Sequence, residues 1–302
     1  MLSIYECFKV TDYLRKKMQS TRISASIEVS PKQVLDIENL VGIAPPLTRI
    51  YITHVGTETT DTLVAAAKKV TDAGYRAVPH FASRRLTTND ALETRIKRMT
   101  QEAGVEDSLI IGGGLEKPNG IFTSTNDVLE TGFFDQNGIK DIGVAGHPEG
   151  SPDFSDDIAL EVLRLKQDLS IRSDANFRIV TQFGFDIDGF IRWAQCIKSS
   201  GIDLPIHFGV AGPAKISTLL KFATVCGVGN SMAFLKKRTS ALFTLATGFE
   251  PENIVNPLEQ YWLNDQKTSS AIEQIHVFPF GGLRKSAEWL EGRGSWSADL
   301  SD

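Results

Sequence analysis

Short apolar runs alternate with amphipathic stretches along most of the chain. The runs are continuous and rich in Ile, Val and Phe, which is typical of strands that are buried on both faces. We expect strands at 26–29, 49–53, 76–81, 108–111, 142–145, 178–183, 205–210 and 275–280. The stretches between them place apolar residues at helical spacing, as Leu63, Ala66, Ala67 and Val70 do. We expect helices at 32–40, 61–73, 88–103, 158–169, 187–199, 214–224 and 284–290.

Strict alternation of strands and helices is typical of a parallel sheet that helices cover. Eight such units within roughly 250 residues favour a closed (β/α)8 TIM barrel of the α/β class. An open doubly wound sheet is the alternative, but no G-x-G-x-x-G follows the first strand. We therefore expect a single domain over residues 1–302, with an N-terminal helix at about 5–19. A helical insertion at about 230–266, without a strand of its own, should precede the last strand.

Composition narrows the class of protein. The chain has 302 residues, 41% of them hydrophobic, and a net charge of −5, so it can bury a full core and has no basic field for nucleic acid. Cys7, Cys196 and Cys226 are scattered, which excludes a disulfide framework and a C-x-x-C metal site. The N-terminus contains Glu6 and Asp12 and has no apolar core, unlike a signal peptide. No apolar run reaches the roughly 18 residues of a membrane span. We expect a soluble, cytoplasmic protein.

Glu28 is the residue around which we organise the candidate site. It lies one residue before the end of the first strand, and Ser30 and Pro31 then have the N-cap and N1 positions of the first helix. An unpaired buried carboxylate costs several kcal/mol, so Glu28 must either have a salt-bridge partner or hold its proton. Acid catalysis near neutral pH would require that burial raise the pKa of Glu28.

Other polar residues follow the remaining strands, and the strand C-termini of a barrel meet at one mouth. This mouth should collect Glu28, Thr53, His54, His80, Gly112, Gly113, Gly114, His147, Gln182 and the turn 280–282. Glycines let backbone N–H groups approach a ligand, although a tight turn would also use them. The Gln182 amide offers a donor and an acceptor, which suits a pterin or pyrimidine edge. Arg84 and Arg85 could hold a carboxylate or phosphate at the rim.

The histidines have two interpretations. Each could be a hydrogen-bonded structural residue, which is how we interpret His207 in the middle of its strand. Alternatively, several imidazoles and a carboxylate around one mouth could bind Zn²⁺. No H-x-H or H-E-x-x-H spacing is present, so we expect no metal.

The motifs together resemble the methylenetetrahydrofolate reductase family from about residue 26 to 284. The resemblance rests on SIEVSPK, RIYITHVG, AVPHFAS, GVAGHPEGSPDF, RIVTQFGFD and HVFPF, which follow in the family's order and spacing. It implies a (β/α)8 barrel that reduces 5,10-methylenetetrahydrofolate to 5-methyltetrahydrofolate, usually with FAD and NAD(P)H. By resemblance, Glu28 is the acid that protonates the folate so that its five-membered ring opens to an iminium.

The resemblance also assigns the remaining site residues. Gln182 matches the amide that binds the pterin, and Phe222 matches a ring beside the p-aminobenzoate. Phe280 and Gly114 complete the folate site. The cofactor residues expected from it are Thr53, His54, His80, Gly112, Gly113 and His147.

Departures from the family concern the flavin. Gly112–Gly114 replace an Arg-Gly-Asp run, His147 replaces a Tyr, and Gln167 with Asp168 replaces an Arg-Lys pair that holds the FAD phosphates. Charged hydrogen bonds are worth roughly 1.5 to 3 kcal/mol, so losing two would cost about two to four orders of magnitude in affinity. FAD is therefore doubtful.

We expect direct hydride transfer between NAD(P)H and the folate. An FAD-dependent reductase and a non-catalytic folate-binding protein that serves a methyltransferase remain the alternatives. The sequence leaves open the choice of NADH or NADPH, the physiological direction and whether the chain forms a homo-oligomer.

Overall fold

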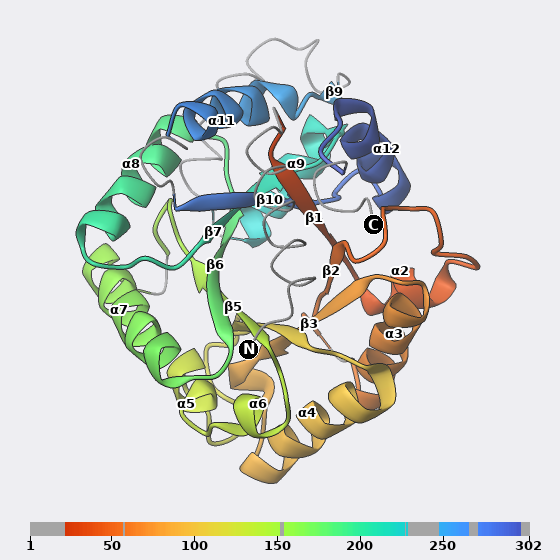
Figure 1. Cartoon of the computed structure of the whole chain (residues 1–302), viewed down its shortest axis with the longest axis vertical. Helices are drawn as coiled ribbons and strands as arrows, with labels where there is room; N and C mark the ends of the chain where they lie inside the picture. Colours follow the sequence, from red (N-terminus) through yellow and green to blue (C-terminus); the bar gives the residue numbers. More distant parts are fainter. Residues whose placement is uncertain are drawn as a thin grey trace, which may run out of the picture.

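The computed structural model describes residues 22–56, 58–151, 154–226, 228, 248–265 and 271–296. Its parallel strands close into a barrel in the order β1-β10-β7-β6-β5-β4-β3-β2 (Figure 1). These strands are β1 (Ser24–Val29), β2 (Arg49–Ile52), β3 (Arg76–Ala82), β4 (Asp107–Ile111), β5 (Asp141–Gly146), β6 (Asn176–Phe183), β7 (Ile206–Ala211) and β10 (Ile272–Phe278). The closed order confirms the expected (β/α)8 barrel over an open sheet.

A ring of helices surrounds the barrel (Figure 1). It comprises α2 (Pro31–Asp36), α3 (Thr60–Asp72), α4 (Asn89–Ala103), α5 (Thr125–Leu129), α6 (Phe133–Gln136), α7 (Asp156–Arg172), α8 (Ile187–Ser199), α9 (Ile216–Val225), α11 (Glu252–Asp265) and α12 (Leu283–Arg293), with a 3₁₀ turn η1 (Ser83–Arg85). The first helix is shorter than expected because Ile37 adopts an extended conformation after Asp36. The short helices α5 and α6 were not expected.

The turn that follows Glu28 has the expected helix start. The Gln33 N–H donates to Ser30 Oγ at 3.2 Å, and the Ser30 N–H donates to Gln33 Oε1 at 3.0 Å. This capping box, with Pro31 in the first turn, satisfies backbone donors that the helix start would leave unpaired. The end of β1 is thereby held in a defined geometry.

Two expected elements lie wholly or partly outside the described residues: the helix at 5–19 and most of the insertion at 230–266. Within the described part of the insertion, β9 (Gly248–Phe249) pairs antiparallel with β8 (Ala214–Lys215), and α11 follows. The expectation that this insertion has no strand is therefore wrong. In this pair Ala214 lies opposite Phe249 and Lys215 lies opposite Gly248.

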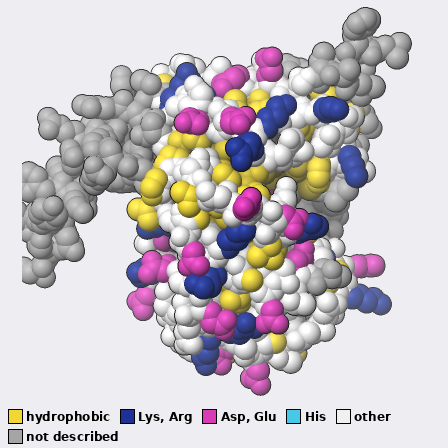
Figure 2. Space-filling view, turned by 90° about the vertical axis from the view of Figure 1, so that its right-hand side faces the viewer, with side chains coloured by type: hydrophobic (Ala, Val, Ile, Leu, Met, Phe, Trp, Pro, Cys, Tyr) yellow, Lys and Arg dark blue, Asp and Glu magenta, His cyan; other side chains and the backbone are white. Residues whose placement is uncertain are grey.

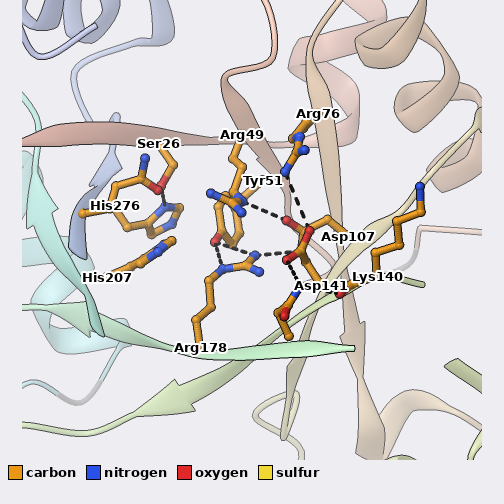
Figure 3. A network of polar contacts seen from close by, with 12 residues as sticks. Ser26, Arg49, Tyr51, Arg76, Asp107, Lys140, Asp141, Arg178, His207 and His276 are labelled. Carbon is orange, nitrogen blue, oxygen red and sulfur yellow. Dashed lines mark hydrogen bonds and ion pairs between the residues drawn. The ribbon is translucent and has the colours of Figure 1, made fainter. Parts of the chain in front are cut away.

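The N-terminal half of the lumen holds a buried network of charges (Figure 3). Asp107 accepts hydrogen bonds from Arg178 at 2.7 Å and from Arg49 at 2.9 Å. The Tyr51 hydroxyl accepts from Arg178 at 2.8 Å. Arg49 and Asp107 open β2 and β4, and at the outer edge of the network the exposed Arg76 of β3 pairs with Asp141 of β5 at 3.7 Å. The network fills the lumen from the N-terminal end, so this barrel has a packed interior rather than a pore.

The surface carries mixed charges. Figure 2 shows the side on which α12, α2 and α3 lie, where Lys and Arg are interspersed with Asp and Glu around hydrophobic side chains. Cys196 and Cys226 are free thiols. In the part of the chain that the structure describes, no helix combines the length and the apolar character needed to cross a membrane.

Candidate active site

Glu28 lies between two buried imidazoles at the C-terminal end of the barrel. Its Oε2 is 3.5 Å from Nε2 of His80 on β3 and 3.6 Å from Nε2 of His276 on β10. Barrel closure explains the second contact, because Ser26 pairs with His276 in the β1–β10 register. The His80 and His276 side chains are 5% and 0% exposed, whereas Glu28 keeps 17% exposure. We call these three residues the carboxylate–imidazole centre.

A second layer holds the His276 ring. Ser26 Oγ lies 3.0 Å from His276 Nδ1, and the Tyr51 ring packs against the imidazole at 4.3 Å between centroids (Figure 3). The Nδ1 contact orients the ring so that Nε2 is turned toward Glu28. Tyr51 also accepts hydrogen bonds from Arg178, so it links the His276 imidazole to the charged network in the N-terminal half of the lumen.

The protonation of this centre differs from the expectation. Burial alone raises the pKa of Glu28, but the hydrogen bond with His276 and the electrostatic interactions with His80 and His276 together lower it below 4.5. Burial also lowers the pKa of His80 to about 4, against the opposing attraction of Glu28. The prediction of a raised Glu28 pKa is therefore wrong for the free protein. Two buried imidazoles beside the carboxyl outweigh its desolvation.

A group of phenylalanines adjoins the centre. The Phe278 ring lies 4.9 Å from His276 and 5.4 Å from Phe183. Phe280 packs edge-on against Phe183 at 4.8 Å and stacks on Phe222 of α9 at 4.4 Å. Phe222, Phe278 and Phe280 remain partly exposed, so their faces are available to a planar ligand. We call Phe183, Phe222, Phe278 and Phe280 the aromatic wall. The strand expected at 275–280 ends at Phe278, so Phe280 lies two residues further on, in the turn after β10.

Gln182 lies in a bulge at the end of β6, where the register with β7 shifts between Val180 and Phe183. The Gly209 N–H donates to Thr181 Oγ1 at 2.8 Å, and the Phe183 N–H donates to Gln182 Oε1 at 3.2 Å. A Cβ at Gly209 would lie 2.5 Å from the Thr181 carbonyl oxygen, so β7 approaches the bulge closely only because residue 209 is glycine. Bulges redirect side chains beside active sites. The contacts of the described residues leave the Gln182 NH₂ group as a donor for a ligand.

The glycine run after β4 is held by the two arginines that precede α4. Gly113 and Gly114 have φ values of +97° and +62°, which favour glycine. The Arg84 N–H donates to the Gly112 carbonyl at 3.0 Å, and Arg85 Nε donates to the Gly113 carbonyl at 3.2 Å. The arginines thus have a structural role in this turn. Gly114 has open space where a side chain would be, so a ligand can approach its backbone.

The other expected cofactor residues lie around the same rim. The Thr53 N–H donates to the Val29 carbonyl at 3.0 Å and so joins β2 to β1 beside Glu28. His54 is buried, and its Nδ1 lies 3.4 Å from Arg95 of α4. The His147 ring contacts Phe154 edge-on at 5.0 Å.

Gln167 lies elsewhere. Its Oε1 accepts a hydrogen bond from the Asp203 N–H at 2.9 Å, and Asp203 belongs to the connection that leads into the N-terminal end of β7. Gln167 is therefore engaged at the end of α7 remote from the mouth. The contact of Gln167 therefore does not bear on a diphosphate bound at the mouth.

Sequence reasoning missed His276, Ser26 and Tyr51. The sequence did contain a signal for His276. The last strand of a closed barrel pairs with the first, and His276 and Phe278 are two residues apart, so their side chains lie on the same face of the strand. Among the described residues, no group of three or more His, Cys, Asp or Glu side chains is arranged to hold a metal ion.

Fold and site together define a (β/α)8-barrel protein with a carboxylate–imidazole centre at its C-terminal mouth. The sequence profile of the methylenetetrahydrofolate reductase family matches residues 14–238, more than half of the chain. The chain belongs to this family.

Two of the relatives that are similar to this chain carry the name of the family. The 5,10-methylenetetrahydrofolate reductase of Pectobacterium carotovorum is 28% identical over 225 residues, which cover 68% of this chain and 70% of that protein. Methylenetetrahydrofolate reductase 1 of Schizosaccharomyces pombe is 46% identical over 70 residues, 23% of this chain and only 11% of the yeast protein. Among solved structures, dihydropteroate synthase from Thermus thermophilus is 11% identical, with a TM-score of 0.40 over 91% of this chain and 94% of that one.

Proposed function

We propose that this chain interconverts 5,10-methylenetetrahydrofolate and 5-methyltetrahydrofolate with NAD(P)H or NAD(P)⁺, by direct hydride transfer without a flavin. The observation on which the proposal depends is the Glu28 carboxyl between two buried imidazoles, beside an aromatic wall, in a chain of this family. A protein that only bound folate would have little use for this proton-transfer centre.

The residues at the mouth fit a folate. A pterin and a p-aminobenzoate ring are planar and aromatic, and they gain from stacking on the partly exposed rings of Phe222 and Phe280. The Gln182 NH₂ group is available to an acceptor on the pterin edge. Phe278 of the aromatic wall contacts His276, so a ring seated against this end of the wall lies next to Glu28.

The same region offers polar partners to a nicotinamide. The Nε2 atoms of His80 and His276 face Glu28, whereas Nδ1 of His80 is buried without a hydrogen-bond partner, and such an atom requires one from a ligand or water. A carboxamide has both a donor and an acceptor to offer it. Glycine at 114 removes the acidic side chain that resemblance associates with the flavin. A bound nicotinamide supplies the hydride for the methylene carbon.

Glu28 delivers the proton. In the free protein its carboxyl is ionised, but a pterin seated against it excludes water from the exposed part of the side chain and raises its pKa. His276 Nε2, at 3.6 Å, is an adjacent proton carrier with Ser26 at its other nitrogen. The proton passes to the folate nitrogen whose bond to the methylene carbon breaks, and this opens the five-membered ring. One proton and one hydride then balance the reduction.

Initial-rate kinetics test the proposal. Direct transfer requires both substrates to be bound together, so double-reciprocal plots against each substrate should intersect. The purified protein should show no flavin absorbance, and added FAD should leave turnover unchanged. Parallel plots with a bound flavin would instead establish the FAD-dependent alternative, and absence of turnover with either nucleotide would reject the reaction.

A further inference from the structure

Arg95 of α4 is a partly buried cation without a carboxylate partner among the described residues. Its Nε donates to Thr60 Oγ1 at 3.1 Å, and its Nη1 lies 3.4 Å from His54 Nδ1. Burial lowers the pKa of Arg95, which reflects the cost of placing its charge there. Arg98, one turn further along the same helix, pairs with Asp61 at 2.6 Å and with Glu102 at 2.7 Å. Buried charges normally have such partners. Arg95 has no carboxylate of this kind among the described residues.

The surroundings of Arg95 are positive. His54 is buried, and burial followed by the charge of Arg95 lowers its pKa to about 4, so it stays neutral at pH 7. Arg85 is a second cation that acts on His54, and its Nη1 donates to the Gly56 carbonyl at 3.2 Å. The nearby acid is Glu58, whose Oε2 accepts from the Gly56 N–H at 2.8 Å. Among the described residues, the pKa of His54 therefore responds to two guanidinium groups and one carboxylate.

We call His54, Glu58, Arg85 and Arg95 the charged cluster. This cluster adjoins the carboxylate–imidazole centre. His54 follows β2 by two residues, and its pKa responds to His80, which is in contact with Glu28. Arg85 also bonds the Gly113 carbonyl, so the cluster extends to the glycine run. A ligand that placed one end beside His80 would have the cluster along the rim between β2 and β4.

We propose that Arg95, with Arg85 beside it, binds a phosphate group of the nicotinamide dinucleotide at this rim. The inference rests on the proposed function for the identity of the ligand. A phosphate would supply the anion that Arg95 lacks, and a guanidinium can hold phosphate oxygens through paired N–H donors. Arg95 uses only Nε and Nη1 on neutral protein atoms, so donors remain for a ligand. The phosphate is either the diphosphate common to both nucleotides or the additional phosphate of NADPH.

Binding measurements without folate test this subsite. We would compare the wild type, Arg95→Gln and the control Arg98→Gln by fluorescence titration with NADH and NADPH, and by thermal shift with inorganic pyrophosphate. Loss of a charged hydrogen bond should raise the Kd of Arg95→Gln by about 10- to 150-fold. It should also abolish the pyrophosphate shift, while Arg98→Gln binds like the wild type. An equal loss for both nucleotides indicates the diphosphate, and a larger loss for NADPH indicates its extra phosphate. Wild-type affinity in Arg95→Gln would overturn the proposal.

A second variant, and the measurement of binding apart from turnover, distinguish failure of the subsite from failure of the proposed reaction. Arg95→Lys preserves the charge but not the paired donors, so it should fold and show an intermediate Kd even if Arg95→Gln is unstable; wild-type binding by this variant would also contradict paired recognition. Binding does not depend on turnover. A wild type that binds nucleotide through Arg95 but reduces no folate would reject the proposed reaction alone, whereas active protein with unchanged binding in Arg95→Gln would reject the subsite alone.

Discussion

Glu28→Gln tests the carboxylate–imidazole centre most directly. Glutamine has the shape of glutamate but cannot transfer a carboxyl proton. Its amide can still contact His80 and His276, whose Nε2 atoms lie 3.5 and 3.6 Å from the present Oε2. We therefore expect a folded protein that binds folate through the aromatic wall and Gln182.

The expected loss is large and confined to turnover. General acid catalysis contributes roughly 10²- to 10⁴-fold, which corresponds to about 3 to 5 kcal/mol of transition-state stabilisation. Glu28 and His276 act as a unit, so the double variant with His276→Gln should be scarcely slower than Glu28→Gln alone. Fully multiplicative losses would show that His276 does not act through Glu28.

Steady-state kinetics and folate titrations of the same preparations measure both effects. Glu273→Gln is the matched control, because Glu273 also faces a buried histidine, His207 at 3.4 Å, but near the opposite end of the barrel. The control should keep full activity. Near-wild-type turnover by Glu28→Gln would refute its role as the acid.

Three further predictions concern the network, the folate and pH. Asp107→Asn leaves Arg178 without its buried acid, and urea unfolding should show a loss of about 3 to 5 kcal/mol; a loss below 1 kcal/mol would contradict this role. Gln182→Ala should raise the folate Kd by roughly tenfold without lowering the melting temperature, and unchanged titration curves would reject the pterin contact. His80 and His207 have folded pKa values of about 4 and about 3, below 6.5 in the unfolded chain. The unfolded state therefore binds more protons as pH falls below 6.5, and unfolding free energy should drop by up to about 1.4 kcal/mol per pH unit for each histidine down to about pH 4. A flat urea-unfolding profile over this range would contradict the burial of neutral imidazoles.

Local patterns in the sequence determined the elements. Continuous apolar runs bounded by helical stretches predict buried parallel strands wherever they occur, and Ser30 with Pro31 predicted the start of α2 because capping involves neighbours only. The position of Glu28 at the end of its strand followed from the same local reading. Residue 37, where α2 has already ended, shows the limit of this approach, because no breaker marks that boundary in the sequence.

Contacts between distant strands were decided by the tertiary structure. Barrel closure brings His276 to Glu28 across almost the whole chain, and the two imidazoles reverse the pKa shift that burial alone would cause. The place of Gln167 at the remote end of α7 and the unpaired charge of Arg95 likewise depend on which helices and loops become neighbours. Periodicity along a chain specifies which face of an element is buried, but the register and closure of the sheet specify what that face meets.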